Sequence, residues 1–180
     1  MVATGTPTLW NNMWAMMLVE TAETISNPPH IPQSQIRLPN RRVTAAELEE
    51  WKADYNAIGG ANSFEEEVLR LTNLERANVG APPLVMNSNL MMSARFKAQK
   101  MADIGYFGHN SPVYGHFANI SRELFNVEIR SEILAIWQRT PQEVVDAWMA
   151  SSTHRAALLN PEFTEVGIGF FRFRWTQKFA

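Results

Sequence analysis

Apolar residues recur at helical spacing through the first two thirds of the chain and take on strand character near its end. Within residues 8–24, 44–58 and 63–104 they return every three or four positions, which is the period of one helix face. Residues 126–130 alternate apolar and polar side chains, and residues 166–175 are apolar almost throughout. The pattern therefore predicts helices first and strands later.

The N-terminal part, residues 1–60, is predicted to be a helical extension with a linker. Its first helix, residues 8–24, is rich in Trp and Met, so we expect it to dock on another surface. The proline-rich residues 27–32 should be extended, because a residue that precedes proline avoids the helical region. The extension can cover itself, the rest of the chain or a second copy, and proximity in sequence favours the same chain.

The second helix of the extension has clear ends. Thr44 and Glu47 have the spacing of a capping box, and Gly59 should end the helix. We expect its apolar stripe to pack against the main domain rather than to bind a partner. The stripe consists of Leu48, Trp51, Tyr55 and Ile58.

The main domain is predicted over residues 61–180. Ser63 and Glu66 have capping-box spacing and should open a helix, and a further helix over residues 90–104 should stop at Gly105. Helices of this kind can cover both faces of a sheet.

Two segments carry the strand signal. Residues 126–130 alternate as a half-buried strand does, whereas residues 166–175 are apolar on both sides and should form a central strand covered on both faces. The fold class is therefore α+β. We predict a three-layer α/β/α sandwich with a small, largely antiparallel central sheet and the N-terminal helical extension.

Composition narrows the class of protein. The chain has 180 residues, of which 46% are hydrophobic and 19% charged. This length and composition indicate one ordinary globular domain with an appendage. A net charge of −2 argues against a nucleic-acid-binding surface, which needs clustered Lys and Arg. The absence of cysteine excludes disulfides, a thiol nucleophile and a cysteine zinc site.

No segment of the sequence has the character of a membrane span or a secretion signal. No apolar run approaches the ~20 residues of a transmembrane helix. The apolar segment 9–19 contains two asparagines, and no basic residue precedes it because Arg37 is the first. If the protein is exported, we expect its signal to have been removed from this sequence. We expect a monomer or a weak dimer.

The candidate chemistry lies between residues 109 and 161, at His109, Glu132, Glu143 and His154. His154 follows a Ser-Ser-Thr break and should lie in a first helical turn, where the helix dipole favours the neutral, metal-binding imidazole. Each residue has a plainer alternative. Glu143 can cap a helix that begins at Thr140, Glu132 can lie on the polar face of a strand edge, and His154 can be a surface histidine.

The order and spacing of several short motifs, from about residue 63 to the C-terminus, resemble the CAP superfamily, or SCP domain, in its bacterial cysteine-free branch. This superfamily includes the cysteine-rich secretory proteins, antigen 5 and the pathogenesis-related proteins. The matching motifs are Asn73-x-x-Arg76, the Met101–His109 segment, Ser131–Leu134, Val144–Arg155, Gly167-x-Gly169 and Trp175-Thr176-Gln177-x-Phe179.

The resemblance implies that His109 and His154 bind a divalent metal, often zinc, in a cavity that also contains Glu132 and Glu143. It also implies an extracellular or cell-envelope protein. Ile133 stands where the family has asparagine and Ser131 where it has glycine, which predicts altered hydrogen bonding around Glu132.

Two functions fit this inventory. The first, which we favour, is a binding module with a metal cavity beside a groove for a lipid, a peptide or a protein partner. The second is a metal-dependent hydrolase, peptidase-like, that uses zinc-bound water and Glu132 or Glu143 as general base. A catalytic zinc usually has three protein ligands, so a third ligand beside the two histidines would decide between them.

Overall fold

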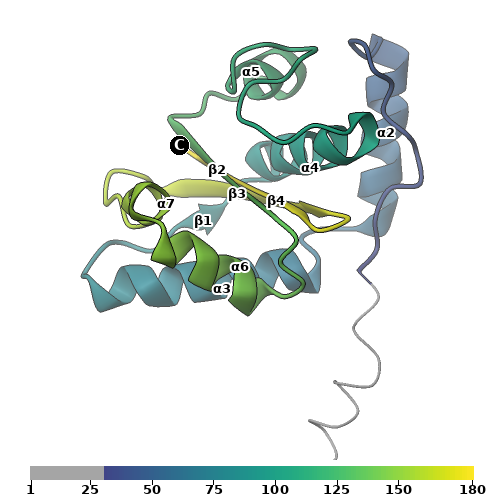
Figure 1. Cartoon of the computed structure of the whole chain (residues 1–180). Helices are drawn as coiled ribbons and strands as arrows, with labels where there is room; N and C mark the ends of the chain where they lie inside the picture. The colour runs from purple at the N-terminus through teal and green to yellow at the C-terminus, as the bar shows by residue number, and fades with distance from the viewer. Residues whose placement is uncertain (1–30) are drawn as a thin grey trace, which may run out of the picture. The chain divides into compact units, whose positions relative to one another are not determined.

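The computed structural model describes residues 31–180, and Pro32–Ala180 form one compact unit. The predicted helix over residues 8–24 lies outside the described residues. No helix within the described range is long and apolar enough to cross a bilayer. The elements, shown in Figure 1, are α2 (Ala45–Ile58), α3 (Ser63–Asn78), β1 (Val85–Met86), α4 (Ser88–Ile104), α5 (Asn119–Phe125), β2 (Ser131–Ile136), α6 (Pro141–Ala150), α7 (Ser152–Leu158), β3 (Glu165–Phe171) and β4 (Arg174–Phe179).

The four strands form one sheet in the order β1-β3-β4-β2. β1 runs parallel to β3, and the β3–β4 and β4–β2 pairs are antiparallel. Helices α4 and α5 lie on one side of this sheet, and α3 and α6 lie on the other (Figure 1). The predicted three-layer sandwich with a small, largely antiparallel sheet is confirmed.

Helix α4 packs on β3 with backbone almost touching backbone. A Cβ atom placed on Gly167 would lie 2.0 Å from the carbonyl carbon of Leu90, and one on Gly169 would lie 2.3 Å from that of Ala94. No side chain fits between the two elements, so glycine is required at both positions. This contact fixes the height of α4 above the sheet.

Helix α2 is part of the same hydrophobic core as α4 and α5. Its predicted capping box between Thr44 and Glu47 is present, and Gly59 caps its C-terminus. Trp51 is fully buried, and its ring lies 5.2 Å from that of Phe96 on α4. The stripe on α2 thus packs against the main domain as predicted, while the boundary between residues 60 and 61 stays a prediction.

An extended segment, residues 32–43, crosses α4 before α2 begins, and we call it the strap. Gln99 of α4 joins the strap to α2, because its Oε1 accepts from the Trp51 indole N–H at 2.8 Å and its Nε2 donates to the Ile36 carbonyl. One turn further on, Asp103 accepts from the Leu38 amide at 2.8 Å. Polar groups of α4 therefore pair the otherwise unpaired backbone of the strap.

The Asn73-x-x-Arg76 motif has a structural role. The Asn73 side chain bonds both the amide and the carbonyl of Leu84. The buried Arg76 guanidinium donates to four carbonyl groups, those of Pro82, Leu158, Asn160 and Phe163. A buried cation needs such partners, and here they tie α3 to the loops before β1 and β3.

Three local predictions differ from the structure. Residues 126–130 are not a strand; they follow α5 as an irregular segment in which Ile129 is buried. The α3 capping box lies one residue earlier than predicted, between Asn62 and Glu65. The single strand predicted over residues 166–175 is a hairpin, because the chain turns at Arg172 and Phe173 between β3 and β4.

Candidate functional site

His109 lies in the loop after α4, with its side chain 51% exposed. Its Nδ1 lies 3.1 Å from Oε1 of Glu132. The Lys97 ammonium on α4 donates to the carbonyls of Gly108 and His109, both at 2.7 Å. Burial lowers the pKa of Lys97 to about 8. The ring and the backbone of His109 are therefore held by separate groups.

Glu132 lies on β2, an edge strand of the sheet, but is buried, so the plainer alternative of a polar strand-edge face does not describe it. It pairs in register with Lys178 of β4, and its Oε2, which makes no hydrogen bond, lies 3.4 Å from the Lys178 ammonium. Lys178 also donates to the hydroxyl of Ser121 at 2.9 Å. Burial lowers the pKa of Lys178, and the Glu132 carboxylate opposes that shift. Glu132 thus has a histidine on one oxygen and an ammonium on the other.

His154 comes from the opposite layer, in the first turn of α7. Ala150 ends α6 and Ser152 begins α7, so Ser151 alone separates the two helices, and its side chain makes no capping hydrogen bond. Burial lowers the pKa of His154, and the electrostatic influence of the nearby His109 side chain lowers it further. The two imidazoles therefore lie within electrostatic range of each other, and His154 favours the neutral form that binds metals.

Glu143 bonds within the N-terminus of its own helix. Its Oε2 accepts from the backbone amide of Arg139 at 2.7 Å, and its amide donates to the Thr140 hydroxyl at 3.2 Å. The capping alternative is thus present in a modified form, because the bonded amide is that of Arg139 rather than of Thr140. The Glu143 residue is exposed.

Within residues 31–180, no three His, Asp or Glu side chains are grouped so that they could hold a metal ion. A histidine that binds a metal through one nitrogen commonly donates from the other to a carboxylate, and the His109–Glu132 contact has this form. It leaves Nε2 of His109 free. Ile133, where the family has asparagine, is buried and offers no hydrogen bond to this region.

Sequence reasoning missed the two buried lysines, Lys97 and Lys178. Both lie in segments of buried residues, Lys97 on α4 and Lys178 between Gln177 and Phe179 on β4. The signal available in the sequence was a charged residue next to apolar residues. Such a residue is rarely fully buried unless it has partners, and both lysines have them.

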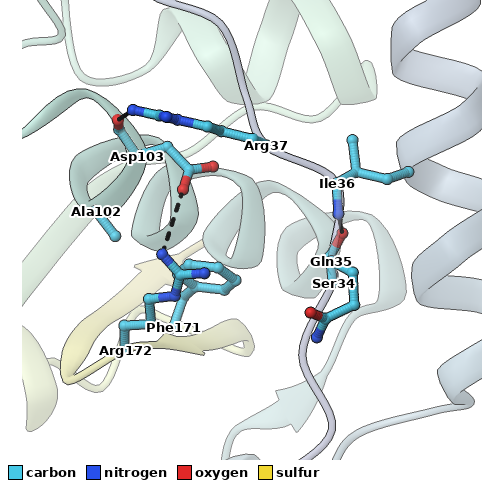
Figure 2. Close-up of a pocket in the computed structure, with 8 residues that line it drawn as sticks. All are labelled: Ser34, Gln35, Ile36, Arg37, Ala102, Asp103, Phe171 and Arg172. Atoms are coloured by element: carbon cyan, nitrogen blue, oxygen red, sulfur yellow. Dashed lines mark hydrogen bonds and ion pairs between the residues drawn. The ribbon is translucent and has the colours of Figure 1, made fainter.

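Three clefts lie elsewhere in the described part of the chain. One of about 360 Å³ opens between the strap, α4 and the β3–β4 turn, with Arg37 and Arg172 facing Asp103 (Figure 2). Two others, of about 350 and 580 Å³, border α2 and the end of α4. None of these three clefts is lined by His109, Glu132, Glu143 or His154.

The family model described as "Cysteine-rich secretory protein family", or CAP, matches residues 69–179. The chain belongs to the CAP family. The matched region of this CAP domain contains all four predicted site residues. It begins after α2, so the α2 contribution to the core lies outside the family match.

Two curated relatives come from Bacillus subtilis. The uncharacterized protein YkwD is 39% identical over 137 residues, 74% of this chain and 53% of its own length. The uncharacterized membrane protein YlbC is 30% identical over 116 residues, 64% of this chain and 34% of its own length. The CAP chain described here therefore spans about half the length of YkwD and a third of YlbC.

Solved structures show the same fold. An extracellular protein with an SCP domain from Bacillus anthracis aligns with a TM-score of 0.62 at 23% identity, covering 77% of this chain and 44% of its own. An outer surface protein of Borrelia burgdorferi aligns with a TM-score of 0.58 at 18% identity, covering 65% of this chain and 93% of its own. At these identities the likeness concerns the fold alone.

Proposed function

We propose that this CAP domain is an extracellular binding module that holds one divalent cation, zinc in the first instance, between His109 and His154. The contact between His109 and Glu132 carries the proposal. A carboxylate on Nδ1 fixes the ring and leaves Nε2 as the metal-binding nitrogen. The lowered pKa of His154 supports the neutral form of the second imidazole.

Binding is favoured over hydrolysis because no group of three metal-binding side chains is present within the described part of the chain. Catalytic zinc usually has three protein ligands, and within residues 31–180 no three His, Asp or Glu side chains are grouped in this way. Glu132 already contacts His109 and Lys178, and Glu143 accepts from the Arg139 amide. Each carboxylate is thus partly engaged by protein groups, which favours a structural role for it over that of a general base.

A bound zinc would act as a Lewis acid that accepts an oxygen or nitrogen donor in its open positions. A donor from a peptide, a lipid headgroup or a protein partner suits this role. The extracellular assignment rests on likeness to the B. anthracis protein, whose description calls it extracellular, and to the outer surface protein of B. burgdorferi.

Zinc titration by calorimetry tests the proposal. We expect one site per chain in the parent and none in a His109→Ala, His154→Ala double variant. His116→Ala is the matched control, because His116 is an exposed histidine outside the site, and it should bind zinc as the parent does. Undiminished binding by the double variant would contradict the proposal.

A second measurement separates binding from hydrolysis. The zinc-loaded parent and Glu132→Gln should both fail to cleave a mixed peptide library analysed by mass spectrometry. Zinc-dependent cleavage that disappears in Glu132→Gln or Glu143→Gln would favour the hydrolase instead.

A further inference from the structure

Two aromatic side chains project from the end of the sheet that carries the β3–β4 turn. Trp137, just after β2, is 69% exposed, and Phe173, in the turn, is 44% exposed. The Trp137 amide donates to the Phe173 carbonyl at 2.9 Å, so the two residues are held side by side. We call Trp137, Phe173 and their neighbours Arg139, Arg172 and Arg174 the aromatic–basic tip.

The backbone at this tip is unfavourable for the residues that occupy it. Trp137, Arg172 and Phe173 have φ values of 81°, 43° and 61°. Positive φ is uncommon for residues other than glycine, and for a bulky side chain it is a genuine outlier. Two-residue hairpin turns with positive φ strongly prefer Asn-Gly or Asp-Gly. Backbone conformation alone would therefore favour glycine or asparagine here. The Phe173 ring packs against that of Phe170 at 6.3 Å, but most of the Trp137 side chain faces solvent, so folding does not explain it.

The charge around the aromatic pair is positive. The Arg174 guanidinium lies 5.5 Å from the centre of the Trp137 ring. The Arg172 side chain is 65% exposed and lies 4.0 Å from an Asp103 carboxylate that is only 3% exposed. Within residues 31–180, Arg139 and Arg174 form no salt bridge. Beside the turn, Arg37 and Arg172 flank the polar cleft shown in Figure 2.

We propose that the aromatic–basic tip docks this protein on an anionic lipid bilayer. Trp and Phe side chains favour the boundary between headgroups and acyl chains, and arginines beside them gain from a negative surface. A projecting tip can enter a bilayer, whereas protein hot spots are typically clustered in well-packed pockets.

This docking surface is separate from the histidine site and does not depend on the proposed metal. Glu132 lies on β2 and Trp137 follows the end of this strand. The five positions between them correspond to roughly 16 Å at ~3.3 Å per strand residue. The two surfaces can therefore be tested independently.

Glycine substitutions give a sharp test because the backbone already suits glycine at these positions. Trp137→Gly and Phe173→Gly should leave the melting temperature unchanged or raise it, while co-sedimentation with phosphatidylglycerol-containing vesicles falls about tenfold. The parent should show a blue shift in tryptophan fluorescence on vesicle addition that Trp137→Gly lacks. If both variants still bind vesicles as the parent does, the proposal is overturned.

The charges are tested separately. Arg139→Gln and Arg174→Gln should each weaken binding about fivefold, and the parent should bind pure phosphatidylcholine vesicles much less. Arg70→Gln and Leu74→Ala on α3 are matched controls, because both residues are exposed, and should bind as the parent does. Either no binding by the parent or equal binding to neutral vesicles would overturn bilayer docking.

Discussion

Replacement of Trp51 by alanine tests whether α2 is an integral part of the CAP domain. Trp51 is fully buried, with its ring 4.6 Å from Tyr55, 5.2 Å from Phe96 and 5.9 Å from Phe125. Its indole N–H donates to Gln99. The substitution removes these contacts and leaves a cavity at the α2–α4–α5 junction.

The expected loss is large relative to the stability of a domain. Truncation of a buried tryptophan costs about 3–5 kcal/mol, and the lost hydrogen bond adds about 0.5–1.5 kcal/mol. Tyr55 still contacts the Gln99 oxygen at 3.4 Å, which limits that second contribution. We therefore expect a decrease of about 4–6 kcal/mol in the free energy of unfolding, against a typical total of about 5–15 kcal/mol.

Urea unfolding followed by circular dichroism measures this loss. Trp51→Phe should lose only about 1–2 kcal/mol, since it keeps a ring but not the N–H donor. Leu74→Ala, at a 51% exposed position, should change stability by less than about 0.5 kcal/mol. A loss below about 1 kcal/mol for Trp51→Ala would refute the reasoning and place α2 outside the core.

Three further outcomes are expected. Trp148→Ala should lose about 3–5 kcal/mol in thermal melts, because Trp148 is 1% exposed; a loss below about 1 kcal/mol would contradict its core position. Gly169→Ala should prevent stable folding, since its Cβ would lie 2.3 Å from the Ala94 carbonyl carbon; a soluble variant with the parent melting temperature would show that α4 can move away. Zinc affinity should fall on acidification because protons compete for imidazole. At His154 this competition begins below the ordinary pKa of 6.5, since burial and the neighbouring imidazole lower its pKa, and calorimetry at several pH values that finds no change would exclude histidine ligands.

Local signals in the sequence were sufficient for the helices. The capping box at Thr44 and the left-handed glycine Gly105 act through bonds to neighbouring residues, so their effect can be read from spacing. The β3–β4 turn was missed because Arg172 and Phe173 are poor residues for positive φ. In residues 126–130, loop packing buries Ile129 and imitates the alternation of a strand.

The site was predictable only in part. Spacing in sequence cannot bring His109, Glu132 and His154 together, because they come from a loop, a strand and a helix in different layers; the family resemblance supplied that grouping. Lys178 was overlooked because lysine is usually exposed. Its burial depends on a cross-strand register with Glu132 that only the assembled sheet defines.

The side-chain amide of Gln99 also determines how far the chain can be shortened from its N-terminal side. A protease that trims residues up to Pro32 leaves Trp51, Ile36 and Asp103 in place as the partners of this amide. Loss of a few more residues removes Ile36 and leaves a buried N–H without an acceptor, which costs about 1–3 kcal/mol. Resistance to digestion should therefore extend at least as far as the strap, ahead of the first residue that the family match includes.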